Sequence, residues 1–388
     1  MSETEKTKKK KVKKIVRFLL GFSLMLGIGF CVGMLAGKLF KSELKPIVNS
    51  MSLGEFIFCV CGFYLWFWFS TLVQVVVHEA GHLVFGLLSG YKFSSFRIGS
   101  FMWVKLNEKI RFKRYSLAGT GGQCLMAPPD LVDGKIPYVL YNLGGSMANV
   151  IVSIVPFVMA LVTWKWDILH GMLLLWGISG LSQAAMNGIP LKIQGNNNDG
   201  YNVKELGKNP ESIRALWLQM KMNELETYGQ TSKDMPEEWF AMPSEEGLQN
   251  SMIASIAVFR CLRMIDEKKF AEADELMEQL LNKKTGMVDV HRKMLINEQI
   301  YCEIVGEQRA ERFEKLMTED QEKFMKSMKT SPSVFRTEYL YAKYVEKDEK
   351  RAERALKDFE RVSEKYPYPQ EIKGEREMIA YAEEKCQK

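Results

Sequence analysis

Paired cysteines are missing from this sequence. Its seven cysteines are scattered, their number is odd, and none forms a C-x-x-C pair. Cys59 and Cys61 lie within an apolar run. This pattern argues against a disulfide framework and against a cysteine zinc site. We interpret the cysteines as reduced packing residues in a chain whose soluble parts face the cytoplasm.

A large excess of one charge is also missing. Lysine and arginine together number 53, against 47 aspartates and glutamates, which gives a net charge of +6. The positive charges concentrate in residues 1–14 and in the loop 91–137. Cations placed beside apolar runs favour a lipid bilayer as the partner, and we expect no binding to nucleic acid.

Long apolar runs fill the first half of the chain, whereas the second half is dense in Glu, Lys and Arg. As helices these runs can cross a membrane, and the longest would reach about 50 Å, against about 30 Å of hydrocarbon. The positive-inside rule places residues 1–14, the loop 91–137 and everything after residue 201 in the cytoplasm. We therefore predict a multi-pass protein of a bacterial cell membrane with both termini cytoplasmic. The predicted spans cover residues 15–37, 53–88, 138–164 and 168–189.

The loop 91–137 contains three short stretches in which apolar and polar residues alternate, at 93–98, 101–106 and 110–115. Such alternation is typical of strands that are buried on one side. We therefore expect this loop to form a small, β-rich, membrane-associated element.

After residue 201 the pattern predicts one helix after another. Asn209 followed by Pro210 indicates a helix start, because asparagine caps the first free amides and proline fits the first turn. Similar stretches begin at Lys268, Glu307 and Glu349, about 40 residues apart, and they resemble an array of tetratricopeptide-like helical hairpins. Three unrelated helical hairpins remain an alternative.

Histidine is scarce, and two of the four histidines stand in the motif His78-Glu79-Ala80-Gly81-His82. Histidines four residues apart share one face of a helix, so both imidazoles can bind one zinc ion. Glu79 lies between them, where its carboxylate can accept a proton from water. The motif sits in an otherwise apolar run, where ionisable residues are costly and usually functional. Hydrogen bonding between helices is the alternative for these side chains.

A catalytic zinc site needs a third protein ligand and an open position. His170 and His291 are poorly placed, because the first is predicted at the opposite membrane face and the second in the soluble part. Asp199 follows the last span and therefore lies on the cytoplasmic side, at the depth expected for His78 and His82. We predict Asp199 as the third ligand, and an ordinary Asn-Asp-Gly turn is the alternative.

Together these residues resemble the site-2 protease family of intramembrane zinc metalloproteases, over roughly residues 53–201. The aspartate comes later than is usual in that family, and Asn198 stands where the family has leucine. The matching elements, in chain order, are HEAGH at 78–82, Gly121-Gly122, residues 145–149, the stretch from Asn187 to Pro190, and Asp199-Gly200.

The resemblance implies that Asn187 and Asn149 lie near a zinc ion, where their amides would bind the substrate backbone or stabilise the oxyanion. Hydrogen bonds between packed helices are the alternative for each. The resemblance also implies peptide hydrolysis, with the predicted ligands holding Zn²⁺ and Glu79 acting as general base.

The predicted function is therefore that of a zinc metalloendopeptidase that cuts membrane-anchored proteins or peptides within or near the bilayer. An inactive scaffold or chaperone acting through the C-terminal array is the alternative, although a scaffold has no need of Glu79. A zinc transporter would need polar side chains along several spans, and these spans carry almost none outside the motif. The predicted parts are a disordered basic tail (1–14), an all-α polytopic transmembrane metalloprotease domain that includes the β-rich loop (15–204), and a cytoplasmic, soluble α-helical array expected to bind a protein partner (205–388).

Overall fold

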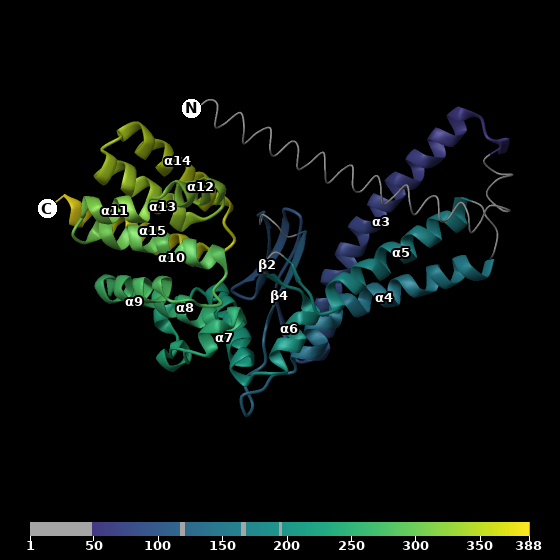
Figure 1. Cartoon of the computed structure of the whole chain (residues 1–388), viewed down its shortest axis with the longest axis horizontal. Coiled ribbons are helices and arrows are strands. Elements are labelled where there is room, and N and C mark those ends of the chain that lie inside the picture. The colour runs from purple at the N-terminus through teal and green to yellow at the C-terminus, as the bar shows by residue number, and fades with distance from the viewer. Residues whose placement is uncertain (1–48, 117–120, 164–167, 194–195, 388) are drawn as a thin grey trace. The chain divides into compact units, whose positions relative to one another are not determined.

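The computed structural model describes residues 49–116, 121–163, 168–193 and 196–387 (Figure 1). The predicted tail, the first predicted span and the turn at 164–167 lie outside these residues. Contacts divide the chain into two compact units, one formed by Met1–Ser70 with Val155–Gly177 and the other by Thr71–Ile154 with Ile178–Lys388.

Among the described residues, three helices are long and apolar enough to cross a membrane: α3 (Leu53–Leu88), α4 (Tyr138–Thr163) and α5 (Ile168–Gly188). They confirm the three predicted spans that fall within the described residues. The protein is therefore an integral membrane protein. Helix α3 has 36 residues and is about 54 Å long, which exceeds the hydrocarbon thickness.

A four-stranded antiparallel sheet follows α3 and has the strand order β3-β2-β1-β4. The three predicted strands are confirmed. The fourth was not predicted, because Gln-Cys-Leu-Met-Ala lacks the alternation that marks a half-buried strand. The strands are β1 (Lys92–Ile98), β2 (Phe101–Leu106), β3 (Lys109–Arg114) and β4 (Gly122–Ala127).

The two faces of this sheet have different surroundings. On one face, a Cβ atom added to Gly122 would lie 2.5 Å from Cγ of Glu79 in α3, so strand and helix are in close contact. On the opposite face, Met102 and Val104 pack with Tyr368 from the C-terminal part of the chain. The sheet is thus held between a membrane helix and the C-terminal helices.

The described chain after α5 is mostly helical and includes one short pair of strands. Asn209 caps α7 by accepting a hydrogen bond from the Glu211 amide, at 2.9 Å, which confirms the predicted helix start. The elements are β5 (Lys192–Ile193), β6 (Asn196–Asn197), α6 (Asp199–Leu206), α7 (Pro210–Thr227), the 3-10 turns η1 (Ser232–Asp234), η2 (Glu237–Phe240) and η3 (Gly247–Gln249), α8 (Ser251–Asp266), α9 (Phe270–Asn282), α10 (Asp289–Val305), α11 (Ala310–Leu316), α12 (Glu319–Ser327), α13 (Pro332–Leu340), the π-helical turn η4 (Tyr341–Glu346), α14 (Glu349–Lys365) and α15 (Pro369–Cys386).

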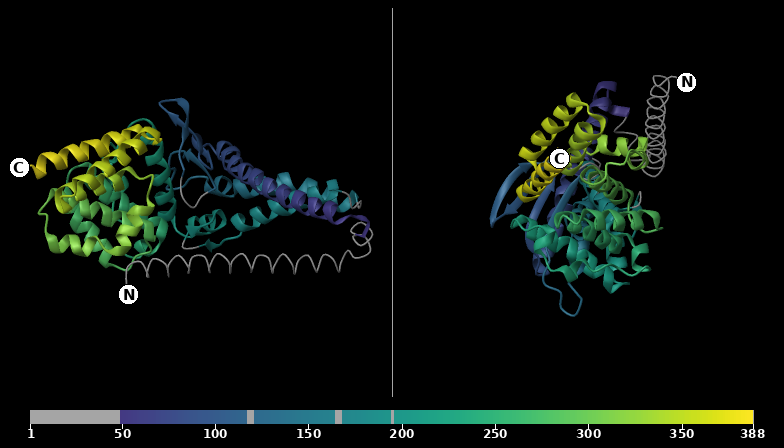
Figure 2. Two further views of the ribbon diagram at one scale, coloured as in Figure 1. Left: turned by 90° about the horizontal axis from the view of Figure 1, so that it is seen from above. Right: turned by 90° about the vertical axis from the view of Figure 1, so that its left-hand side faces the viewer.

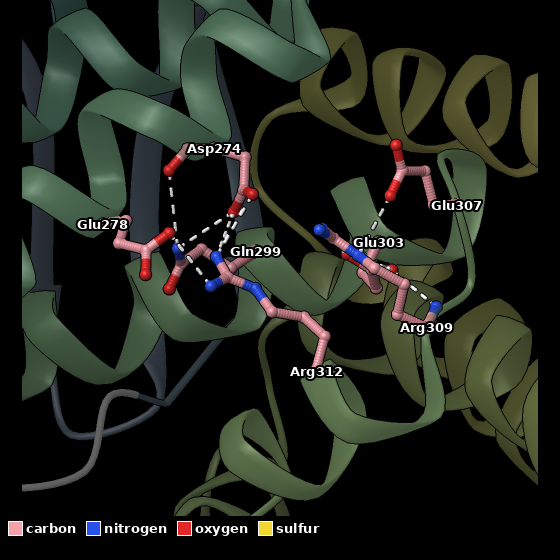
Figure 3. A network of polar contacts seen from close by, with 7 residues as sticks. All are labelled: Asp274, Glu278, Gln299, Glu303, Glu307, Arg309 and Arg312. Atoms are coloured by element: carbon pink, nitrogen blue, oxygen red, sulfur yellow. Dashed lines mark hydrogen bonds and ion pairs between the residues drawn. The ribbon is translucent and has the colours of Figure 1, made fainter.

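Helices α8 to α15 form one bundle around a shared apolar core (Figure 2). The three similar sequence stretches form α9, α11 and α14. Ion pairs tie the first two of these helices together, since Arg312 of α11 contacts Asp274 at 3.0 Å and Glu278 at 2.9 Å, both in α9 (Figure 3). Arg309 contacts the buried Glu303 of α10 at 2.7 Å. The bundle is therefore fixed by charge pairs as well as by its core.

Candidate metal centre

The C-terminal half of α3 presents the HEAGH motif on one side of the helix. His78, Glu79 and His82 are all buried, with exposed fractions of 8, 9 and 9%. The Nε2 atoms of the two histidines lie 3.2 Å apart. The spacing of four residues, slightly more than one helical turn, is what brings the two rings together.

Asp199 completes this group as the first residue of α6. Its Oδ2 atom lies 3.1 Å from Nε2 of His78 and 3.4 Å from Nε2 of His82. Burial raises the pKa of Asp199, but its contacts with the two imidazoles outweigh burial and lower the pKa to about 2. The carboxyl group is therefore ionised, as a metal ligand must be. The structure thus brings together the three residues predicted as ligands.

Each imidazole is oriented by a hydrogen bond at Nδ1, on the side of the ring away from the cluster of Nε2 atoms. Nδ1 of His82 lies 2.7 Å from the carbonyl oxygen of Tyr141, and Nδ1 of His78 lies 2.8 Å from Oδ1 of Asn149. The Asn149 amide nitrogen donates to the main-chain carbonyl of Gln74, at 2.8 Å, and this bond fixes which end of the amide faces His78. With the proton on Nδ1, each ring presents its Nε2 lone pair to the cluster.

A buried polar relay continues behind Asn149. Its amide nitrogen also donates to Oε1 of Gln74, and the Gln74 amide nitrogen donates to Oγ of Ser153, each at 2.8 Å. Asn149, Gln74 and Ser153 are fully buried. Sequence reasoning missed Gln74 and Ser153, although a polar residue inside an apolar span is a usable signal. The side-chain amide of Asn149 makes its hydrogen bonds to His78 and Gln74, so in this structure it supports a predicted ligand.

The geometry of the three ligand atoms fits a zinc ion. A tetrahedral zinc with bonds of about 2.0–2.1 Å holds its ligand atoms about 3.3 Å apart, and the three separations here are 3.1, 3.2 and 3.4 Å. Oδ2 of Asp199 is buried, and a cation held between the three ligand atoms would compensate its charge. Among the described residues, no other histidine, cysteine or acidic side chains form such a group, so His170 and His291 stand apart from it.

Glycines allow the helices that carry the site to approach closely. A Cβ atom on Gly81 of α3 would lie 2.3 Å from the carbonyl oxygen of Gly144 in α4, and one on Gly145 would lie 2.5 Å from the His78 ring. Neither contact can be relieved cheaply, because the first meets main chain and the second meets a ligand. The ring of His78 therefore occupies space that a side chain at residue 145 would fill.

We expect Gly145→Ala to lower zinc affinity about tenfold to a hundredfold, because the added methyl group must displace the His78 ring, and losing ligand orientation typically has an effect of this size. A competitive chelator titration of the purified protein measures it. Gly62→Ala is the control, since a Cβ atom there meets nothing within 4 Å. Unchanged affinity in the Gly145 variant would contradict this account of His78.

A cavity of about 510 Å³ opens beside the cluster. Its lining includes all three predicted ligands, Glu79, and Asn187 of α5. The Asn187 amide nitrogen donates to the carbonyl oxygen of Gln183 at 3.0 Å. Strand β4 also lines the cavity, and it forms one edge of the sheet. The cavity therefore brings the cluster, an amide and a strand edge to one place.

A membrane helix that carries two histidines and a glutamate, closed by a carboxylate from a following helix, defines the class of membrane-embedded metallopeptidases. The profile of Peptidase family M50 matches residues 66–348. The chain belongs to this family, which is the site-2 protease family. No curated protein and no solved structure matches the chain. Membership implies a metal ion and protein substrates, and the His78, His82 and Asp199 cluster is consistent with a zinc site.

Proposed function

We propose that this metallopeptidase is an intramembrane zinc endopeptidase that cuts membrane-anchored proteins or peptides within or near the bilayer. The observation that carries the proposal is the convergence of His78, His82 and Asp199 beside Glu79, on a helix long and apolar enough to span the membrane. Loss of cleavage with retained zinc in a Glu79→Gln variant is the test.

Three ligands would hold the ion and leave one position open. Zinc bound there would supply a Lewis acid that activates water and polarises the scissile carbonyl. Glu79 is the general base in this proposal. Its carboxylate accepts a proton from the attacking water and then donates that proton to the leaving amine. Burial of Glu79 against Gly122 keeps the carboxylate beside the cluster.

We assign different roles to the two asparagines of the site. Asn187 lines the cavity, so its amide is available to bind the substrate backbone or to stabilise the oxyanion. Asn149 is fully buried, and its hydrogen-bonding groups are used by His78 and Gln74. We propose that Asn149 orients His78, and that substrate contact is left to Asn187.

The substrate must be extended near the cluster, because a helical peptide keeps its carbonyl groups in hydrogen bonds. Strand β4 is an edge strand, and its residues Gly122 to Leu125 line the cavity. A free strand edge can pair with an added strand. We propose that an extended substrate segment pairs with β4 and so presents a peptide bond to Glu79.

The outer half of the sheet is proposed to lie at the membrane surface. The face that contacts α3 at Gly122 continues over β2 and β3, where Trp103 is 40% exposed and Phe112 is 54% exposed. Their ring centroids are 5.6 Å apart. Aromatic rings beside cations are typical of the interface between lipid and water. The neighbouring cations in β3 are Lys109, Arg111, Lys113 and Arg114.

The C-terminal helices are proposed to lie in the cytoplasm, in a domain of residues 205–388, and to bind a protein partner. The pairing of α9 with α8 and α10, and of α13 with α14, is the arrangement that a tetratricopeptide-like array would have. The preceding membrane domain would cover residues 15–204 and lie in a bacterial cell membrane. A partner bound to the array would act close to the sheet, because Tyr368 packs on that sheet.

Reporter fusions test the proposed orientation. Fusions at Lys41 and Lys165 are expected to report the external side, and fusions in the loop 91–137 and at Gly207 the cytoplasm, because the basic segments stay inside. Activity of a paired set of reporters, one active only outside and one only inside, gives the readout. An external signal at Gly207 would contradict four spans with both termini in the cytoplasm.

A further inference from the structure

The connection between α5 and α6 leads directly to Asp199, the first residue of α6. Within this connection strands β5 and β6 run antiparallel, and Lys192 pairs with Asn197. The hairpin ends where the main-chain amide of Asn198 donates a hydrogen bond to the main-chain carbonyl oxygen of Leu191, at 3.1 Å. The chain therefore returns to its starting point immediately before Asp199.

The side chain of Asn198 makes four hydrogen bonds at this point. Its amide nitrogen donates to the carbonyl oxygens of Met186 and Ile189, both at 2.6 Å. Its carbonyl oxygen accepts from the main-chain amides of Leu191, at 3.0 Å, and Tyr201, at 2.9 Å. The first pair satisfies carbonyl groups at the end of α5, and the bond from Tyr201 caps α6. One side chain thus joins the end of one helix to the start of the next.

The same two helix ends pack so closely that residue 200 has no room for a side chain. A Cβ atom on Gly200 would lie 2.0 Å from the carbonyl oxygen of Gly188, so α6 begins in direct contact with the last residue of α5. Asp199 lies between Asn198 and Gly200 in the chain. Its position relative to the histidines is therefore set by the hydrogen bonds of Asn198 on one side and by the contact of Gly200 with Gly188 on the other.

We propose that Asn198 is a positioning residue for the metal centre, and that its two amide N–H bonds to α5 hold Asp199 at the distance required by His78 and His82. This inference rests on the proposed role of Asp199 as zinc ligand. An apolar side chain at residue 198 could not donate to the carbonyl oxygens of Met186 and Ile189.

The experiment compares Asn198→Ser and Asn198→Ala with the wild-type protein. Serine caps a helix about as well as asparagine but lacks the side-chain amide donors. The serine variant therefore keeps the cap of α6 and loses the hydrogen bonds to Met186 and Ile189. Zinc affinity by chelator competition, and the visible absorption spectrum of the cobalt(II)-loaded protein, are measured for each variant. Asn209→Ala is the matched control, because Asn209 also caps a helix but contacts none of the ligands. Asp199→Ala provides the reference for loss of a ligand.

Both Asn198 variants are expected to lose zinc affinity about tenfold to a hundredfold, with an altered cobalt spectrum, while the Asn209 control keeps both. If serine restores affinity and spectrum and only alanine lowers them, Asn198 is merely a cap and the proposal fails. Wild-type affinity in both variants overturns it as well. Unchanged affinity in Asp199→Ala would instead remove Asp199 from the ligand set, and both the proposed site and this inference would fall.

Discussion

Glu79→Gln is expected to retain one zinc per chain and to lose turnover about a hundredfold to ten-thousandfold, the usual effect of removing a general base. The neutral amide cannot accept the proton of water. Metal binding should persist, because Glu79 is not among the three residues whose ligand atoms converge. Zinc content by elemental analysis and cleavage of a membrane-anchored reporter peptide are the two measurements.

The size of the side chain matters for this test. Glu79 is packed against Gly122, where an added Cβ atom would lie 2.6 Å from its Oε1 atom. Glutamine has almost the same volume as glutamate, so the change tests proton transfer and leaves the packing intact. Glu55→Gln makes the same substitution in the first turn of the same helix, remote from the cluster. This control should keep full turnover.

A parallel truncation separates the enzyme from a scaffold. A chain ending after Gly207 lacks helices α7 to α15 but keeps every residue of the metal centre. If the glutamine variant shows a wild-type cellular phenotype while the truncated chain has none, the array carries the function and the protease proposal fails. If the glutamine variant is inactive with full zinc occupancy, Glu79 is catalytic. The same variant can then retain uncleaved substrate, which co-purification identifies.

Parts of this fold that depend on local pattern could be predicted from the sequence. The described spans appear as helices because apolar runs of this length can satisfy their main-chain groups in lipid only as helices. Strands β1 to β3 follow from their alternation. Asp199 was expected near His78 because both lie toward the same side of the membrane, and the structure places its carboxylate 3.1 Å from that ring.

Other parts depend on packing between distant segments and could not be predicted. Strand β4 has no alternating pattern, and it is recognised only by its pairing with β1. The relay through Gln74 and Ser153 requires that α3 and α4 lie side by side. Asn149 was expected near the metal. Its hydrogen bond to His78, however, follows from the orientation of α4, which the sequence pattern does not specify. Asn198 reaches the end of α5 only because the hairpin brings the chain back.

Removal of single ligands should have the largest effect on metal binding. His78→Ala and His82→Ala are each expected to abolish stoichiometric zinc, because each removes one of the two imidazole nitrogens, whereas Asp199→Ala leaves both nitrogens in place. Asp199→Ala should weaken binding by more than the hundredfold that loss of a supporting residue can cause, since it removes a direct ligand. Zinc content after dialysis and affinity by chelator competition measure these changes. His291→Ala, which removes a histidine outside the cluster, should keep wild-type zinc.

The ranking within this series distinguishes two views of the site. If zinc is held by all three side chains, the Asp199 variant loses zinc affinity, as the histidine variants do. Its cobalt(II) spectrum also changes, because the ligand set changes. If the two histidines act with a different third ligand, the Asp199 variant keeps wild-type affinity and spectrum while both histidine variants lose the metal. The buried Oδ2 atom of Asp199 lies within 3.4 Å of both Nε2 atoms. The imidazoles and the carboxylate bind zinc only in their deprotonated forms. Metal-free protein should therefore take up zinc more weakly as pH falls, because protons and zinc compete for the same Nε2 atoms.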